Sequence, residues 1–353
     1  MDTSNENLYF ESEETTKRDV SLDKAKMGLL FLVIIGHILV FYSPNYYSLF
    51  KLNPGNSKNT IEAVLSVIYS FHMAAFFIIS GATYNKNKNY IEFNLRNIKK
   101  LVIPTVIFTV IVLVPVMKYV GTYKNFEFIE WFYNTRNRHL WFVESLVIIL
   151  FVNRTLDIIP DMKIIKFVLS IVAYYLVMDK IITIKPINLL NYFVYFQLGE
   201  VLGKDSLKLS WKSLIIYIAL AVFINYMLLI GNKSNKIVEY IKNNHIFTIL
   251  NALLLTVTFS KVFEIIPTKL CKHQFNVYLF HVPVIYVSMH LIKKYFILDG
   301  LTPALVTFVL TIILSFGVSK FLRYLNIKFA VIWSNMKESK KNINSNMALI
   351  QSK

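Results

Sequence analysis

The chain contains a succession of apolar segments, each long enough to cross the hydrocarbon layer of a bilayer. Hydropathy windows of about 19 residues place about ten such segments along the chain. Their approximate ranges are 27–44, 61–83, 101–120, 139–155, 163–180, 183–203, 211–231, 246–266, 275–292 and 303–323. Because lipid offers the backbone no hydrogen-bond partners, spanning segments of this length must be helical. The sequence therefore predicts an all-α fold, a polytopic bundle of transmembrane helices.

Composition supports a membrane protein and narrows the class of function. Of the 353 residues, 55% are hydrophobic and only 17% are charged, and the mean hydropathy is +0.50. The net charge of +17 does not indicate nucleic-acid binding, because the basic residues lie mostly in short loops between apolar segments. The single cysteine, Cys271, excludes an internal disulfide framework and a cysteine-rich metal site. We predict no bound metal.

The distribution of lysine and arginine predicts the orientation of the chain. If ten segments span the membrane, the strongly basic flanks all fall on one side, which should be the cytoplasm together with both termini. These flanking residues are Lys17, Arg18, Lys24, Lys26, Lys86, Lys88, Arg96, Lys99, Lys100, Lys328, Lys337, Lys340 and Lys341. The opposite face is less basic, although Arg136, Arg138, Lys233 and Lys236 weaken the contrast.

The sequence predicts that the chain is divided into three regions. Residues 1–18 are expected to form a disordered N-terminus, and residues 6–12 fit the protease-site remnant of an expression tag and a native sequence equally well. Residues 19–330 are expected to form one integral membrane domain. Residues 331–353 form a polar cytoplasmic tail, which we expect to be disordered from Lys337 onward.

The first two apolar segments each contain a histidine far from their ends. At 1.5 Å per residue, His37 lies about 15 Å and His72 about 17 Å from the starts of these segments. Both imidazoles are thus expected near the middle of a layer about 30 Å thick, where ionisable groups usually serve function. His37 suits a general base. His72 could orient His37, bond a reacting carbonyl or be the base itself, and the alternative for both is a histidine that only bonds a neighbouring helix.

Other polar residues form weaker candidate sites. Lys26 lies about three helical turns before His37 and near the same face of that helix. The basic residues Arg96, Lys99 and Lys100 fit either a phosphate-binding cluster or an ordinary positive flank. Trp141 and Glu144 open the fourth segment after an aromatic stretch, which fits either sugar stacking or an interfacial helix.

Three further positions have mainly packing interpretations. Gly81, after Ser80, indicates close packing between helices. Glu200 is expected to be a structural partner for a basic residue. His281, about one third into the ninth segment, fits a cosubstrate pocket and plain packing equally well.

Five short blocks occur in a fixed order along the chain. They are Asp23–Lys26 followed by Gly36-His37, then Phe71–Gly81, Lys99–Pro104, His139–Phe142 and Tyr278–Pro283. Together they resemble the acyltransferase-3 family of integral membrane acyltransferases, and most closely its fucose 4-O-acetylase-like branch. The chain departs from the pattern at four places. Lys26 stands where the wider family often has arginine, Ala74 replaces a usual proline, and one extra residue separates His281 from Pro283. Ahead of Pro104 the family often has Arg-x-x-Arg, where this chain has Arg96-x-x-Lys99 or Asn97-x-x-Lys100, and lysine lacks the two-pronged hydrogen bonding of arginine.

The resemblance implies an O-acyltransferase of the bacterial cytoplasmic membrane. It implies acetyl-CoA or another acyl-CoA as cosubstrate, with the phosphates near Lys26, Arg96, Lys99 and Lys100. His37 would activate a hydroxyl of a cell-surface or capsular carbohydrate or glycolipid, with His72 assisting and Trp141 and Glu144 contacting the acceptor. Direct transfer and an acyl-histidine intermediate both remain open.

The competing hypothesis is a carrier or flippase that moves a glycolipid or an acyl group without chemistry. Such a protein should show inverted repeats and broken helices at the membrane midplane. Neither is evident in the sequence.

Overall fold

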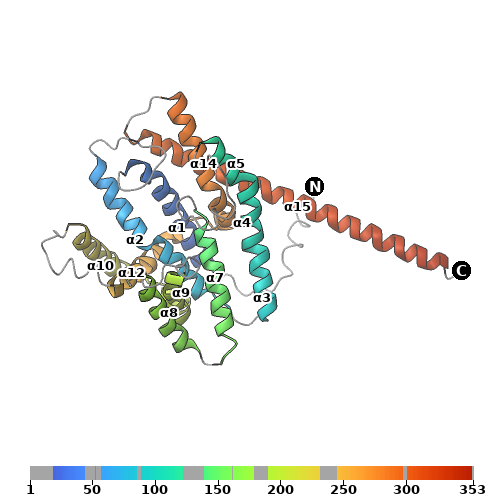
Figure 1. Cartoon of the computed structure of the whole chain (residues 1–353), viewed down its shortest axis with the longest axis horizontal. Helices are drawn as coiled ribbons and strands as arrows, with labels where there is room; N and C mark the ends of the chain where they lie inside the picture. Colours follow the sequence, from blue (N-terminus) through green and yellow to red (C-terminus); the bar gives the residue numbers. More distant parts are fainter. Residues whose placement is uncertain are drawn as a thin grey trace.

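A computed structural model describes residues 19–43, 52, 57–85, 89–121, 139–160, 162–178, 190–230, 245–296 and 300–351. Within these ranges every regular element is a helix (Figure 1). Six helical stretches are long and apolar enough to cross a membrane: Val20–Tyr42, Lys58–Ala82, Tyr90–Tyr119, Ile246–Ile265, Gln274–Tyr295 and Thr302–Leu325. The prediction of an all-α, multi-pass membrane protein is therefore confirmed. The count of ten spans and the side on which the termini lie remain predictions.

Further helices occupy the other predicted spans. They are α7 (Trp141–Leu156), α8 (Lys163–Met178), α9 (Phe193–Leu202) and α10 (Trp211–Ile230). Several predicted features lie outside the described residues. They are the first third of the predicted span 183–203, the predicted N-terminal region 1–18, and the loop residues Lys86, Lys88, Arg136, Arg138, Lys233 and Lys236.

Helix α1 (Val20–Leu39) begins earlier than the apolar pattern suggests. Asp19 caps it, because its Oδ1 accepts hydrogen bonds from the backbone N–H groups of Ser21 and Leu22 at 3.1 and 3.4 Å. The polar residues before Met27 are thus helical too. As a result, His37 lies about 26 Å along the helix, near its end, and not at its middle as the sequence pattern suggested. A short 3-10 turn, η1 (Val40–Tyr42), extends the helix.

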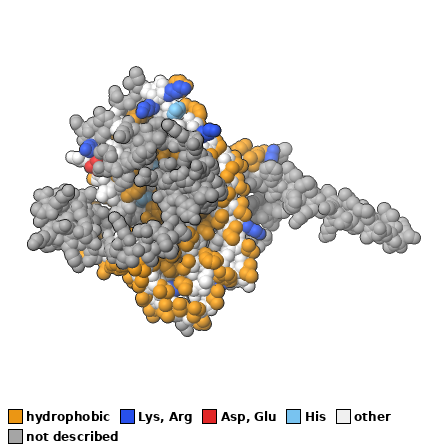
Figure 2. Space-filling view, viewed as in Figure 1, with side chains coloured by type: hydrophobic (Ala, Val, Ile, Leu, Met, Phe, Trp, Pro, Cys, Tyr) orange, Lys and Arg blue, Asp and Glu red, His pale blue; other side chains and the backbone are white. Residues whose placement is uncertain are grey.

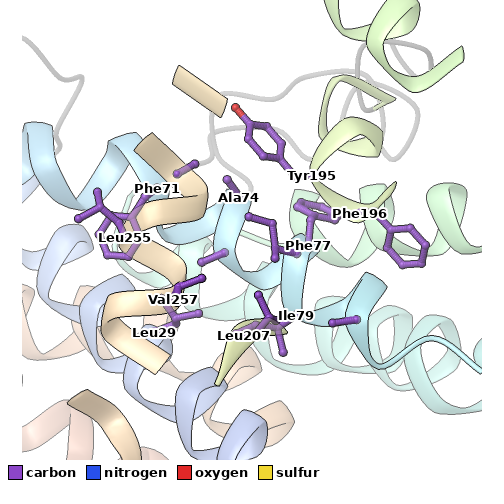
Figure 3. Close-up of a cluster of buried hydrophobic side chains, with 14 of the residues drawn as sticks. Leu29, Phe71, Ala74, Phe77, Ile79, Tyr195, Phe196, Leu207, Leu255 and Val257 are labelled. Carbon is purple, nitrogen blue, oxygen red and sulfur yellow. The ribbon is translucent and has the colours of Figure 1, made fainter. Parts of the chain in front are cut away.

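The core of the bundle forms where α2 (Lys58–Ala82) packs against α9. A methyl group at Gly81 would lie 1.9 Å from the carbonyl oxygen of Phe196, and one at Gly199 would lie 1.9 Å from that of Ile78. The two backbones can approach this closely only because both positions are glycine. Figure 3 shows Phe77 of α2 and Phe196 of α9 in the buried cluster around this contact. The prediction that Gly81 marks close packing is confirmed.

The stretch Tyr90–Tyr119 is one helical run with two wider turns. It consists of α3 (Tyr90–Asn97), η3 (Ile98–Val102), α4 (Ile103–Phe108), η4 (Thr109–Leu113) and α5 (Val114–Tyr119), in which η3 and η4 are π-helical. Each π-helical turn comes just before a proline, Pro104 or Pro115. Since proline has no N–H to donate to the preceding turn, the regular bond pattern is interrupted at these points.

The C-terminal part contains α12 (His245–Val262), η8 (Phe263–Ile265), α13 (Thr268–Cys271), α14 (Gln274–Tyr295) and α15 (Thr302–Gln351). Helices α14 and α15 pack closely together. Helix α15 continues through the predicted polar tail as far as Gln351, and Figure 1 shows this part running away from the bundle. No proline or glycine follows Gly317, so nothing in the tail sequence terminates the helix.

The outer surface is strongly apolar. Large hydrophobic side chains on α4, α8, α10 and α15 are exposed, among them Ile164 at 77% and Ile215 at 72%. Figure 2 shows hydrophobic side chains over much of the lower face of the molecule. An apolar surface this extensive is unsuited to water and fits contact with lipid.

Candidate active site

Three imidazoles from separate parts of the sequence meet inside the bundle. The ring of His281, on α14, lies 5.3 Å from that of His37 on α1, measured between centroids. It lies at the same distance, 5.3 Å, from the ring of His139, in the turn before α7, in an edge-to-face arrangement. The sequence assigned no role to His139, and for His281 it left a cosubstrate pocket and packing equally open.

The local structure of α14 holds His281 in place. Its side chain is fully buried, and Nδ1 lies 2.6 Å from the carbonyl oxygen of Tyr278 in the preceding turn. The other ring nitrogen, Nε2, is buried and has no hydrogen-bond partner among the described residues. A buried polar atom without a partner is uncommon and calls for an explanation.

A proline in α14 leaves a backbone carbonyl free to form a hydrogen bond with His139. Pro283 has no N–H, so the carbonyl oxygen of Leu279, one turn earlier, lacks its helical donor. The Nε2 atom of His139 lies 3.2 Å from this oxygen. The hydroxyl of Tyr278 donates in turn to the carbonyl oxygen of His139. The start of α7 is thereby fixed against α14, while Nδ1 of His139 stays buried without a partner in the described structure.

His37 differs from these two residues because it is only half-buried. Within the described part of the chain, neither of its ring nitrogens makes a hydrogen bond, and its ring contact is with His281. Its nitrogens are therefore available to a ligand that reaches the site.

His72 lies on α2 beside the His37 helix. It is 5% exposed, and its Nδ1 lies 2.6 Å from the carbonyl oxygen of Ile68. The ring of Tyr69 packs edge-on against it at 5.1 Å. The two predicted histidines are close enough to interact electrostatically. The structure thus places His72 near His37, but the ring next to His37 is that of His281.

The predicted phosphate-binding residues come from two parts of the bundle. Lys26 is half-buried on α1. Arg96 lies at the end of α3, and Lys99 and Lys100 lie in the π-helical segment η3, where all three side chains are exposed. These segments pack against α7. Their joint role remains a prediction.

The predicted acceptor-binding residues lie beside the imidazoles. Trp141 follows His139 by two positions, and its ring packs 5.1 Å from that of Tyr192. Glu144, one turn further, is close enough to Tyr278 to interact electrostatically. Both side chains are half-buried. Their position at the start of α7 is compatible with contact to an acceptor.

Glu200 belongs to a different site, as expected for a structural residue. Its Oε1 lies 2.7 Å from Nζ of the buried Lys166, which also pairs with Asp157 at 2.7 Å. Among the residues that the structure describes, no group of three or more His, Cys, Asp or Glu side chains is arranged to hold a metal ion.

Comparison with known proteins bears on the chemistry of this site. The family model of acyltransferase 3, described as an acyltransferase domain, matches residues 19–320. Neither a curated protein nor a solved structure matches the chain significantly. The matched region contains all three imidazoles and most of the chain. The protein therefore belongs to the acyltransferase 3 family, which implies an integral membrane acyltransferase that uses an acyl donor.

Proposed function

We propose that this protein transfers an acetyl group from acetyl-CoA to a hydroxyl group of a cell-surface or capsular carbohydrate. Membership of the acyltransferase 3 family supports acyl transfer. The resemblance of the five sequence blocks to the fucose 4-O-acetylase-like branch supports a carbohydrate acceptor and a bacterial cytoplasmic membrane. The observation that carries the proposal is the half-buried His37, with both ring nitrogens unbonded beside two buried imidazoles.

In this reaction His37 acts as general base. A neutral imidazole accepts the proton of the acceptor hydroxyl while the oxygen attacks the thioester carbonyl. The carbon–sulfur bond then breaks, and the imidazolium returns the proton to the departing thiolate, which leaves an ester and free CoA. A route through an acetyl-histidine intermediate uses the same residue as nucleophile. His72 assists from α2, where its Nδ1 is held by the carbonyl of Ile68.

Different residues are proposed to bind the two substrates near His37. Lys26, Arg96, Lys99 and Lys100 are proposed to bind the CoA phosphates, because ammonium and guanidinium groups pair with phosphate. Three of these residues, Arg96, Lys99 and Lys100, are exposed, as a site for a soluble cosubstrate requires. Trp141 and Glu144 are proposed to bind the acceptor, through ring stacking and a carboxylate hydrogen bond.

Mass spectrometry of surface glycans tests this proposal. Glycans from cells with the gene should carry an added acetyl mass that is missing from cells without it. In a second arm, membranes containing the protein receive acetyl-CoA and glycan extracted from cells that lack the gene. An acyltransferase releases CoA thiol in proportion to the added glycan, whereas a carrier or flippase releases none. Unchanged glycans together with no thiol release would rule out the proposed reaction.

A further inference from the structure

The unpartnered Nε2 of His281 points to a role for this residue. We infer that His281 is a positioning residue for His37: its Nε2 accepts the N–H of His37 and so directs the other His37 nitrogen toward the acceptor hydroxyl. The inference rests on the proposed function and adds to it a residue that was expected only to pack or to line a cosubstrate pocket.

The backbone determines which nitrogen of His281 can accept a hydrogen bond. A carbonyl oxygen only accepts, so the contact of 2.6 Å between Nδ1 and the carbonyl of Tyr278 requires the proton on Nδ1. In the neutral ring, Nε2 then carries the lone pair. This nitrogen is fully buried and lacks a donor among the described residues, which leaves an acceptor without its partner.

The neighbouring side chains identify the missing donor. Three rings contact His281: those of His37, His139 and Tyr278. The hydroxyl of Tyr278 already donates to the carbonyl of His139. His139 uses its Nε2 proton for the carbonyl of Leu279, so its Nδ1 is also an acceptor in the neutral ring. Of the three, only His37 has an uncommitted N–H to offer.

The geometry permits this hydrogen bond after a small movement. The rings of His37 and His281 are 5.3 Å apart between centroids and inclined by 40°. At this separation, two ring nitrogens that face each other lie about 3 Å apart, which is within hydrogen-bonding range. His281 is the more restrained of the two, because it is fully buried and bonded to its own helix.

This hydrogen bond would determine the tautomer of His37. With one N–H donated to His281, the opposite nitrogen of His37 presents its lone pair to the acceptor hydroxyl. The proton of that hydroxyl moves to His37 and then to the thiolate, while His281 keeps its own proton and continues to accept from His37. The arrangement orients a base as the carboxylate of a catalytic triad does, but without placing a negative charge inside the membrane.

Kinetics of substituted proteins distinguish this role from simple packing. The purified full-length protein is assayed with acetyl-CoA and glycan extracted from cells lacking the gene. His281→Phe preserves the ring shape but removes the acceptor, whereas His281→Gln retains an acceptor oxygen. We expect His281→Phe to lower kcat by about 100-fold, with KM for acetyl-CoA and for glycan within twofold of wild type. His281→Gln should regain at least one tenth of the wild-type kcat.

Two further variants complete the design. His290→Phe, on the same helix, removes a half-buried imidazole that packs on Tyr119 and should leave kcat unchanged. Because His281 is proposed to act through His37, adding His281→Phe to His37→Ala should cause no further loss.

Several results would overturn the inference. One is a wild-type kcat for His281→Phe. Another is a loss of kcat in His281→Gln as large as that in His281→Phe, together with a raised KM for either substrate. The third is a further loss of kcat when His281→Phe is added to His37→Ala. These outcomes leave the proposed function intact if His37→Ala alone is inactive. Absence of glycan-dependent thiol release by the wild-type protein would instead overturn both.

Discussion

Two polar regions lie at opposite ends of α7, and they differ in whether their ionisable groups are paired. At the far end, Lys166 is 1% exposed and forms ion pairs of 2.7 Å with both Asp157 and Glu200. The hydroxyl of Tyr84 donates to the same aspartate at 2.6 Å. At the near end, buried acceptor nitrogens of His139 and His281 have no donor in the described structure.

This difference in pairing suits the Lys166 region to a structural role and the imidazole region to proton transfer. Charges that are paired inside a protein are strongly coupled to the fold, because removal of one partner leaves the other buried alone. The Lys166 network joins α8 to α9 and to the end of α7, so it suits a structural role. Unpaired lone pairs, in contrast, are costly for stability and useful for proton transfer. We therefore expect substitutions in the first region to affect folding and those in the second to affect turnover.

The largest effect on stability is expected from Lys166→Met. This change leaves the half-buried carboxylates of Asp157 and Glu200 without the ammonium group of Lys166, which should cost about 3–5 kcal/mol in unfolding free energy. Thermal unfolding in detergent measures the loss. Lys163→Met, an exposed position on the same helix, is the matched control and should unfold as wild type does. Equal stability of the two variants would show that the Lys166 network does not support the fold.

A smaller loss of stability is expected from Gly199→Ala. The added methyl group would meet the carbonyl of Ile78, so α2 and α9 must separate, at a cost of about 1–3 kcal/mol. Gly317→Ala, on α15, places its methyl group in open space and should leave stability unchanged or slightly raised. The same thermal unfolding assay compares the two, and a larger loss at Gly317 would contradict the packing described here.

A change at Pro283 tests the imidazole region without removing an imidazole. In Pro283→Ala the new N–H competes with His139 for the carbonyl of Leu279, so the start of α7 should be held less firmly. Loss of about one hydrogen bond predicts a fall in kcat of up to about tenfold. Pro303→Ala is a control, since Pro303 lies in the first turn of α15, where N–H groups lack helical partners. An unchanged kcat for Pro283→Ala would show that turnover does not depend on Pro283 leaving the Leu279 carbonyl free for His139.

The smallest effect is expected at the start of α1. Burial raises the pKa of Asp19, but hydrogen bonds from Lys208 and from the backbone of Leu22 and Ser21 outweigh it, and the pKa falls below its ordinary value of 3.8. A carboxylate with a lowered pKa stabilises the fold above its unfolded-state pKa, and this contribution disappears as the pH falls through the folded-state value. Asp19→Ala should therefore cost about 1 kcal/mol at neutral pH.

The pH dependence gives this prediction its control. Unfolding midpoints of Asp19→Ala and wild type should converge as the pH falls below 3.8, whereas Asp19→Asn, which keeps the capping oxygen, should lose less at neutral pH. A constant difference across this range would mean that the charge of Asp19 contributes nothing.

Part of the fold and of the candidate site could be predicted from the sequence. Apolar length alone identified the helical membrane fold, and Gly81 was recognisable as a packing position. The spacing of His37 and His72 indicated a buried ionisable site, but the start of α1 depended on the Asp19 cap, which apolar windows do not detect.

The remaining features depend on contacts between distant segments. Pro283 shows in the sequence that a carbonyl of α14 loses its donor, yet nothing local indicates that His139 binds it. The burial of Lys166, inside the predicted span 163–180, depends on Asp157 and Glu200, which lie on neighbouring segments. The meeting of His37 with His281 requires α1 and α14 to pack together, which periodicity does not specify.

Turnover per folded molecule of His37→Gln tests the central claim most directly. The measurement is glycan-dependent release of CoA thiol by the purified variant, beside its thermal unfolding midpoint. If His37 is the general base, turnover falls by about 10³-fold while the unfolding midpoint stays at the wild-type value. Turnover within twofold of wild type would contradict the account, and the imidazole region would then have to be regarded as structural, like the Lys166 network.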